Sequence, residues 1–361
     1  MEKEVIEIEE IAETEKEIYE EKDIQEVLKM FAPGTSLRTA LDDFLRARMG
    51  ALIVFENDKT QDIIEKGFWV NCKFSAQKLV ELAKMDGAII LSNDAKKILY
   101  ANTLLAPSLG VSTKETGTRH KAAERTAKQT GTIVVAVSER KNKITLYYKD
   151  MKHIMDESSE ILRRASETLQ VLEKQREMFN DLIFNLNILE INNLVTIDDV
   201  SGVFQRIEII KRISEIVKRY LIELGKEGMI VSMRLKELTR NLNKDEEIIL
   251  RDYFGSDSRK MLDMLEKMNF DFLLESNNIS RMLFEELHDK PISPRGIRIL
   301  SKTNLLERYI DYFVVNFGTL DKVLSIDEDE LSKIFESEDL AKHFLQELDV
   351  LKEKIMLGKK I

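Results

Sequence analysis

The 361-residue sequence predicts an α/β N-terminal domain with a mixed central sheet, followed by an all-α helical region and a small all-α C-terminal module. Three observations predict this order. Between residues 50 and 149, short runs of β-branched and aromatic residues, bounded by Gly, Asn or Asp, predict strands, and a segment with helical spacing of its apolar residues lies among them. No proline occurs from residue 150 to residue 290, so nothing there forbids continuous helix. Two prolines and a glycine then cluster in PISPRG, residues 291–296, where a series of shorter helices begins.

The chain opens on an acidic segment. Residues 1–26 contain twelve Asp or Glu and three Lys, a composition typical of a solvated helical or frayed extension. The α/β domain is predicted over 27–150, and its first helix follows Pro33 and Gly34 and ends at Gly50. The expected strands are residues 50–55, 85–91, 97–105, 132–138 and 143–149, with a helix over 75–84. Several of these runs are continuously apolar, which favours a sheet covered on both faces.

The helical region is predicted over residues 151–290. Its first helix carries an apolar seam with alternating spacings of three and four, formed by Leu162, Ala165, Leu169, Leu172, Phe179, Ile183 and Leu186. A second helix is predicted to begin at Thr196 as N-cap, with Asp199 in its first turn, and to end at Gly225. We interpret these stripes as packing between helices of a spacer or assembly domain. The C-terminal module is predicted over residues 291–361.

Composition excludes several classes of protein. The single cysteine, Cys72, excludes a disulfide framework and suits a reducing compartment. No apolar run approaches membrane-spanning length, and the N-terminus lacks the pattern of a signal peptide. The net charge of -10 argues against bulk attraction to nucleic acid or anionic lipid. We therefore expect a cytoplasmic protein with no membrane partner.

The segment ETGTRHKAAERTAKQTG, residues 115–131, predicts a helix with an unusual first turn. Thr118 is the expected N-cap, Gly131 the expected end, and Arg119, His120 and Lys121 lie in the first turn. The positive end of the helix dipole disfavours cations there by a few tenths of a kcal/mol each, on the order of 0.3. A bound phosphate would offset this repulsion. The alternative is structural: the side chains turn outward or pair with acids such as Glu115.

A second candidate for chemistry is Asp86-Gly87-Ala88. Asp86 closes a helix-to-strand turn before a buried strand, where a carboxylate can hold a divalent metal, and Gly87 lets a nucleotide approach the backbone. Asp-Gly is otherwise an ordinary turn. The sequence contains no P-loop, no Gly-x-Gly-x-x-Gly fingerprint and no Cys/His cluster for zinc.

Together these motifs resemble a known family. Asp86-Gly87-Ala88 followed by Gly-Thr-Arg-His-Lys (117–121), with GFW (67–69) and YAN (100–102), is similar to the diadenylate cyclase domain. The order of cyclase domain, helical spine and C-terminal helix–hairpin–helix resembles the DisA family of bacterial DNA integrity scanning proteins. The resemblance covers nearly the whole chain beyond the acidic extension.

The resemblance implies a reaction in which two ATP condense to cyclic di-AMP and two pyrophosphates, with two sites facing each other between protomers. It implies Mg²⁺ or Mn²⁺ as cofactor, a homo-oligomer that is octameric in the family, branched DNA as a partner, and a role in DNA damage and repair. The catalytic residues would be Asp86, which would also bind the metal, together with Arg119 and His120. The ATP-binding residues would be Gly87, Leu105, Thr118, Arg119, His120, Lys121, Ala122 and Ser138.

Two positions depart from the family pattern. The phosphate motif ends in Lys121 where the family has arginine, which loses the bidentate fork. The C-terminal hairpin reads Phe335-Glu336-Ser337-Glu338, with acids in place of glycines, and residues 291–361 hold eleven Lys or Arg against thirteen Asp or Glu. We expect only weak, salt-sensitive DNA binding, through a cluster on the first helix of the module formed by Arg295, Arg298, Lys302 and Arg308. The alternatives are another metal-dependent nucleotidyltransferase, or a non-catalytic DNA-structure-binding protein that senses nucleotide.

Overall fold

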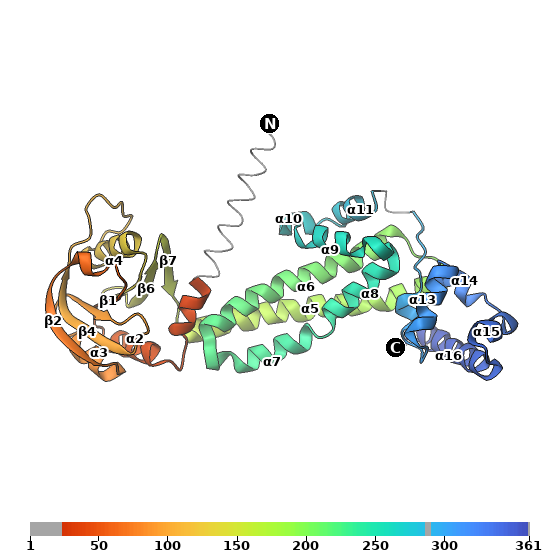
Figure 1. Cartoon of the computed structure of the whole chain (residues 1–361), viewed down its shortest axis with the longest axis horizontal. Helices are drawn as coiled ribbons and strands as arrows, with labels where there is room; N and C mark the ends of the chain where they lie inside the picture. Colours follow the sequence, from red (N-terminus) through yellow and green to blue (C-terminus); the bar gives the residue numbers. More distant parts are fainter. Residues whose placement is uncertain (1–23, 286–289, 360–361) are drawn as a thin grey trace, which may run out of the picture. The chain divides into compact units, whose positions relative to one another are not determined.

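The computed structural model describes residues 24–285 and 290–359 and confirms the predicted fold class. The chain divides into two compact units (Figure 1). The first contains the chain up to Ser166 together with Lys218–Ser232, and the second contains Glu167–Val217 and Met233 onward. Most of the predicted acidic extension lies outside the described residues. The described part begins in a helix over residues 24–30.

A seven-stranded mixed sheet forms the centre of the first unit (Figure 1). Its strands are β1 (Ala51–Phe55), β2 (Ile64–Lys73), β3 (Ala88–Leu91), β4 (Lys97–Leu105), β5 (Ile133–Ser138), β6 (Lys143–Tyr148) and β7 (Met151–Met155). The strand order is β2-β4-β3-β1-β5-β6-β7. β1 and β3 pair in parallel, and the other pairs are antiparallel. The mixed sheet was predicted correctly.

Both faces of this sheet are covered, as the continuously apolar strands predicted. One face packs against the helix over residues 24–30, α2 (Ser36–Arg46) and α3 (Ala76–Leu82), through a core that includes Phe31, Phe44 and Phe55. The other face packs against α4 (Thr118–Thr130), where the small residues Ala123 and Ala127 let the helix approach β1 and β5 closely. All five residues of β1 are buried, which makes it the central strand.

Two strands were not predicted. β2 is an edge strand whose residues are mostly exposed and whose register with β4 is interrupted by bulges, so it lacks a clean alternating pattern. β7, the opposite edge, is only five residues long and lies beyond residue 150, where we had expected the helical region to begin. The sheet therefore extends past that predicted boundary.

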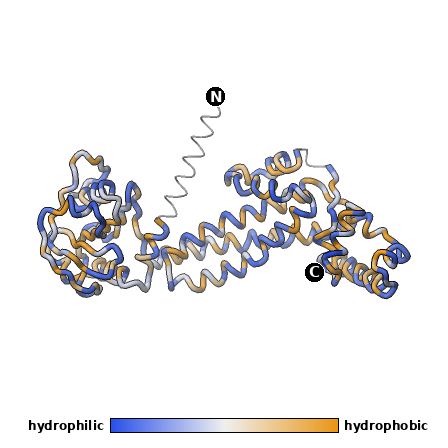
Figure 2. The backbone as a smooth tube through the Cα atoms, in the orientation of Figure 1, coloured by the Kyte–Doolittle hydropathy of each residue, from blue (hydrophilic) through white to orange (hydrophobic). Residues whose placement is uncertain are grey.

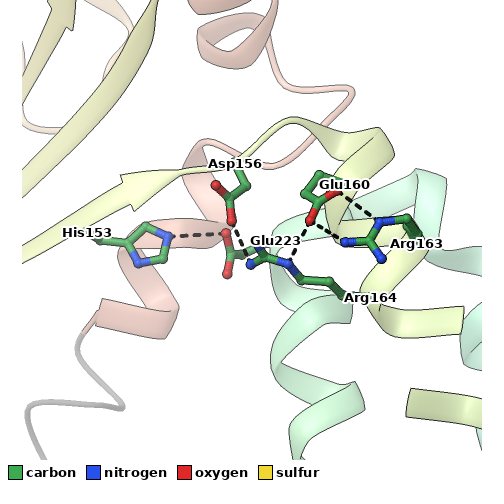
Figure 3. Close-up of polar contacts among 6 residues, drawn as sticks. All are labelled: His153, Asp156, Glu160, Arg163, Arg164 and Glu223. Atoms are coloured by element: carbon green, nitrogen blue, oxygen red, sulfur yellow. Dashed lines mark hydrogen bonds and ion pairs between the residues drawn. The ribbon is translucent and has the colours of Figure 1, made fainter. Parts of the chain in front are cut away.

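A cluster of charged side chains follows β7. His153 of β7 lies 3.2 Å from Glu223, whose helix, α6 (Ile197–Leu224), passes beside the strand (Figure 3). Asp156 lies 2.9 Å from Arg164, which also contacts Glu160 in the first turn of α5 (Ser158–Ile191). The Arg164 pairs are largely exposed and each contributes little to stability, whereas the His153–Glu223 contact is partly buried.

The long helices α5 and α6 carry the predicted apolar stripes, and hydrophobic and hydrophilic residues alternate along both (Figure 2). Of the predicted seam, Ala165, Leu169, Leu172, Phe179 and Leu186 are buried and Ile183 is partly buried, but Leu162 is exposed, so the prediction is wrong at that position. The predicted capping box at the start of α6 is confirmed, because the Thr196 N–H donates to the Asp199 carboxylate at 2.8 Å. The shorter elements that follow are η2 (Gly225–Gly228), α7 (Met229–Leu238), α8 (Leu242–Phe254), η3 (Gly255–Asp257), α9 (Ser258–Glu266), α10 (Phe270–Leu273) and α11 (Ser276–Phe284).

The C-terminal module is helical, as predicted. Its helices are α12 (Ile297–Leu300), α13 (Glu307–Asn316), α14 (Leu320–Leu324), α15 (Glu328–Phe335) and α16 (Glu338–Met356). They enclose an aromatic core in which the rings of Phe313 and Phe344 stack with centroids 5.9 Å apart, and Phe335 meets Phe344 edge to face. In the part of the chain that the structure describes, no helix has the length and apolar character needed to cross a bilayer.

Candidate functional site

A cavity of about 540 Å³ opens in the first unit, where the turn before β3, the end of β4 and the first turn of α4 come together. Its volume lies in the range of small-molecule sites. Six of the residues predicted for the nucleotide site line it: Asp86, Gly87, Leu105, Thr118, Arg119 and Ala122. These residues come from three separate segments of the sequence, so the fold brings the two predicted motifs into one site.

Asp86 and Gly87 form the turn between α3 and β3, as predicted. The Asp86 side chain is exposed at the cavity. Gly87 has φ +89°, and a Cβ there would lie 2.8 Å from the carbonyl oxygen and 2.9 Å from the nitrogen of Thr103 in β4. The glycine is therefore required by the close approach of β4 and by its own backbone conformation. Its role in letting a nucleotide approach remains a prediction.

The first turn of α4 lies at the cavity, where Thr118 and Arg119 form part of the lining, and the first N–H groups of a helix have no partner within the helix. The helix begins at Thr118, and Gly117 occupies the N-cap position, so our assignment of Thr118 as the cap is wrong by one residue. Gly117 has no side chain to accept from the helix, and the first turn contains no acid. Because neither a capping side chain nor a carboxylate neutralises this end, it remains available to an anion.

Arg119 is held with its guanidinium beside the cavity. Its Nη1 donates to the Val137 carbonyl of β5 at 3.2 Å. The guanidinium also lies directly over Gly50, where a Cβ would come within 2.1 Å of Nη1. Gly50, at the start of β1, therefore leaves the space that Arg119 needs. The cation at the helix N-terminus is thus fixed by two neighbouring strands rather than free to turn outward.

His120 points away from the cavity lining. Its Nδ1 lies 2.9 Å from the hydroxyl of Tyr147, a buried residue of β6 that is also in the core beneath α4. Burial lowers the pKa of His120 below its ordinary value, against the opposing effect of the Glu115 carboxylate. The lowered pKa favours the neutral ring, so His120 adds less positive charge to the first turn than the sequence suggests, and its predicted contact with phosphate remains a prediction.

Two further predicted residues, Lys121 and Ser138, do not line the cavity. The Ser138 hydroxyl instead accepts from the Lys141 N–H at 3.2 Å in the turn after β5. The next residue, Glu139, does line the cavity, as do Arg48, Gly50 and Thr103, none of which we predicted. Glu139 and Gly50 flank strand ends, which is the sequence signal that could have suggested them.

The carboxylates at the cavity fit a divalent ion that relies on its substrate for ligands. Asp86 and Glu139 are the acids of the cavity lining. Across the described residues, no group of three or more His, Cys, Asp or Glu side chains could enclose a metal. Mg²⁺ and similar ions in nucleotide sites commonly use one or two carboxylates and complete their shell with phosphate and water. The residues present are therefore suited to such an ion, with Asp86 as the predicted ligand.

One of the four residues predicted to bind DNA is buried. Arg298 of α12 is 6% exposed and pairs with Glu190 of α5 at 2.5 Å. Our prediction that Arg298 contacts DNA phosphate is therefore wrong, because the guanidinium is committed inside the protein. The four cations also do not share one helix: Arg295 precedes α12, Lys302 follows it, and Arg308 lies in α13. Of these, Lys302 and Arg308 are exposed.

The hairpin that departs from the family pattern joins α15 to α16. Glu336 ends α15 in the left-handed conformation with φ +53°, and Ser337 caps α16 through a bond from the Leu340 N–H. Glu338 and Asp339 lie in the first turn of α16. Acids at this position already neutralise the helix N-terminus and repel phosphate. The turn is therefore built without an anion site.

Comparison with known proteins agrees with this architecture. Residues 38–152 match the family model described as DisA bacterial checkpoint controller nucleotide-binding, and residues 155–287 match the DisA bacterial checkpoint controller linker region. The DNA integrity scanning protein DisA of Acetivibrio thermocellus is 44% identical over 321 residues, covering 86% of this chain and 89% of that protein. DisA of Clostridioides difficile is 42% identical, covering 87% and 90%. DisA of Clostridium kluyveri is 40% identical over 348 residues, covering 94% and 98%. The similarity includes the whole cavity.

Proposed function

Since the chain belongs to the DisA family, we propose that it is a diadenylate cyclase, which condenses two ATP into cyclic di-AMP and two pyrophosphates. One observation carries the proposal. The carboxylate of Asp86 and the uncapped first turn of α4, with Arg119 beside it, meet at one cavity although they are more than thirty residues apart in the sequence. A site for a polyphosphate next to a site for a metal is the arrangement that phosphoryl transfer requires.

In this proposal the residues divide the work between binding and activation. The N–H groups of the first turn of α4 and the Arg119 guanidinium bind the triphosphate and stabilise the charge that develops at the α-phosphorus. Asp86, at the cavity, binds the divalent ion and helps to activate the attacking 3′-hydroxyl. Mg²⁺ or Mn²⁺, when bound, supplies positive charge to the phosphates. Leu104 and Leu105 offer an apolar edge for the adenine.

The reaction also determines the assembly. Each 3′-hydroxyl oxygen forms a bond to the α-phosphorus of the other ATP, the bond from that phosphorus to pyrophosphate breaks, and the hydroxyl proton is released. Asp86 and Arg119 of one protomer build a single cavity of this kind, so the reaction of two ATP molecules requires the cavities of two protomers to face each other. We therefore propose a homo-oligomer containing such pairs, and an octamer by the family resemblance. The alternative of a non-catalytic nucleotide sensor would bind ATP without product.

The decisive experiment is to incubate the purified protein with ATP and Mn²⁺ and to identify the product by chromatography and mass spectrometry. We expect cyclic di-AMP and pyrophosphate in a ratio of one to two. Asp86→Asn should lower the rate at least about 100-fold while ATP binding and the fold persist, because the amide keeps the shape but loses the charge that binds metal. Asp94→Asn, at the other end of β3, is the matched control and should be fully active. Binding of ATP without any cyclic product would reject the cyclase.

For DNA, the described module supports only a reduced role. With Arg298 buried and the hairpin acidic, Lys302 and Arg308 remain as exposed cations of the predicted cluster. We propose weak binding of branched DNA through these two residues, with a slope of about two in a plot of log affinity against log salt. Titration of a four-way junction at several salt concentrations measures this slope. Tight binding that survives replacement of both residues would show another DNA surface.

A further inference from the structure

A chain of hydrogen bonds runs beneath the first turn of α4. His120 contacts the Tyr147 hydroxyl at 2.9 Å, and that hydroxyl donates to the Glu115 carboxylate at 2.9 Å. Glu115 also forms an ion pair with Lys152 of β7, which lies directly opposite Tyr147 in the β6–β7 ladder. The chain therefore connects the segment before α4, the first turn of α4 and two strands of the sheet.

The protons of this chain can be assigned from its chemistry. A tyrosine hydroxyl has one proton, and an ionised carboxylate can only accept. Burial acts to raise the pKa of Glu115, but the hydrogen bonds from Lys152 and Tyr147 outweigh it and leave that pKa below its ordinary value. Tyr147 therefore donates to Glu115 and can only accept from His120. In the neutral ring the proton must then be on Nδ1, and Nε2 is unprotonated.

The position of the chain explains what it does for the cavity. Thr118 and Arg119 line the cavity, and His120, the next residue along, is the point where this turn of helix is fixed to the sheet. Glu115 fixes the segment that enters the helix, two residues before the Gly117 cap. The turn whose N–H groups face the cavity is thus held on both sides of its cap. These contacts add to the bond from Arg119 to the Val137 carbonyl and to the bond from the Lys114 N–H to Glu124 of α4.

We propose that Tyr147 and Glu115 are positioning residues of the nucleotide site, which hold His120 as its Nδ1–H tautomer and thereby fix the first turn of α4 for triphosphate binding. This inference rests on the proposed function only in the identity of the ligand. Neither residue lines the cavity, so Tyr147 acts on it through His120, and Glu115 acts through the same hydrogen bonds and through the segment that precedes the Gly117 cap.

The tautomer itself is the first test. The chain has four histidines, so ¹⁵N-labelling of histidine and long-range ¹H–¹⁵N spectra can resolve the His120 ring. We expect protonated Nδ1 in the parent. Tyr147→Phe removes the acceptor, and the ring should revert to the Nε2–H form that is common in peptides. Glu115→Ala should cause the same change without altering either partner, because the Tyr147 hydroxyl becomes free to donate to Nδ1. Glu115→Gln retains an acceptor and should restore the parent tautomer.

Nucleotide affinity is the second test. Calorimetry with an ATP analogue that has a methylene group between the α- and β-phosphorus measures binding without turnover. We expect Tyr147→Phe to weaken binding about fivefold, the effect of one hydrogen bond. Tyr148→Phe is the matched control, because Tyr148 is on the same strand but packs in the opposite core. The losses of affinity in Tyr147→Phe and Glu115→Ala should be less than additive in the double variant, since both changes remove the same restraint on His120.

Two results would overturn the proposal. One is an Nε2–H tautomer of His120 in the parent protein. The other is an unchanged affinity for the analogue in Tyr147→Phe when the tautomer has changed. Because the affinity is measured without turnover, the positioning role can fail while the protein still makes cyclic di-AMP, and it can hold in a protein that only binds ATP.

Discussion

The N-termini of α4 and α12 both have backbone N–H groups without a partner inside the helix, but only those of α12 donate to a side chain. At α12 the N–H groups of Gly296, Ile297 and Arg298 donate to the carboxylate of Asp252, at 2.6, 2.8 and 3.1 Å. At α4 the cap is Gly117, no side chain accepts from the first turn, and Arg119 lies beside it. The N-terminus of α12 is therefore saturated by the carboxylate of Asp252, whereas the N-terminus of α4 is left open for an external anion.

The difference shows how to separate a structural helix end from a binding one. A saturated end lies deep in the protein with its partners: Asp252 is fully buried, and beside it the buried Arg298 pairs with Glu190. An open end lies at a cavity and is fixed by contacts beside it, in this case Arg119 over Gly50 and His120 on Tyr147. Basic residues at a helix start are therefore ambiguous until the accepting group is found.

The largest expected effect is at the saturated end. Arg298→Met would leave the buried Glu190 carboxylate without its ion pair, which should destabilise the second unit by about 3 to 5 kcal/mol. Urea unfolding measures it. Arg308→Met, an exposed arginine over the Tyr309 ring, is the control and should change stability by less than about 1 kcal/mol. If Arg298→Met and Arg308→Met both changed the free energy of unfolding by the same small amount, the buried Arg298–Glu190 pair would not be needed for the stability of the second unit.

The pH dependence of the saturated end should be the next largest. Burial, followed by the nearby Glu190 carboxylate, raises the pKa of Asp252 to about 6 from an ordinary value of 3.8. A raised pKa means that the folded state binds the proton more tightly, so this group's contribution to stability is present below pH 4 and lost as pH rises to 6. Relative to Asp252→Asn, the parent should therefore gain about 2 to 3 kcal/mol between pH 7 and pH 4. Unfolding curves of both proteins at each pH measure the gain, and a constant difference would contradict it.

At the open end the expected effect is on binding rather than on stability. Arg119→Ala should weaken binding of the non-hydrolysable ATP analogue about tenfold, because a charge-assisted contact is lost. Stability without nucleotide should stay within about 0.5 kcal/mol or rise slightly, since removing a cation relieves its repulsion from the helix dipole. Calorimetry and thermal melts measure the two quantities. A marked loss of stability in the nucleotide-free protein would make Arg119 structural and end the contrast between the two helices.

The smallest effect concerns a third helix start, that of α16. Glu336 precedes its Ser337 cap with φ +53°, a conformation that costs a residue with a Cβ about 1 kcal/mol. Glu336→Gly should therefore stabilise the module by about 0.5 to 1 kcal/mol, and it should leave DNA binding unchanged. Thermal unfolding and a junction titration check both parts. Destabilisation would indicate that the Glu336 side chain makes a necessary contact.

Most of the fold could be predicted because hydrophobic pattern and punctuation agree along the chain. The buried strands β1, β3, β5 and β6 read as apolar runs, whereas β2 and β7 are edges whose exposed, partly charged residues give no such signal. At the cavity, Asp86 and Arg119 could be predicted because their residue types and their places at element ends imply ligand chemistry.

The rest of the site depended on tertiary contacts. Sequence predicts that His120 and Arg298 are polar, but not that a buried tyrosine lies under one and a buried glutamate beside the other. In both cases the hydrogen-bond partner in the structure lies far away in sequence, and for Arg298 that partner excludes the predicted contact with DNA phosphate. Glu139 was missed for the converse reason, because an exposed acid after a strand is common and only the fold places it at the cavity.

The edge strand β7 constrains the length of the turn before it, because two consecutive residues of the strand, Lys152 and His153, make its contacts with other parts of the chain. Lys152 lies opposite Tyr147 and pairs with Glu115, while His153 lies opposite Leu146 and pairs with Glu223 of α6 (Figure 3). Consecutive side chains point to opposite faces, so a shift of one residue would exchange the two partners. The two-residue turn Lys149–Asp150 sets this register. Point substitutions in that turn should be tolerated over evolutionary time, but a one-codon insertion or deletion would disconnect the strand from both the nucleotide site and the long helix at once.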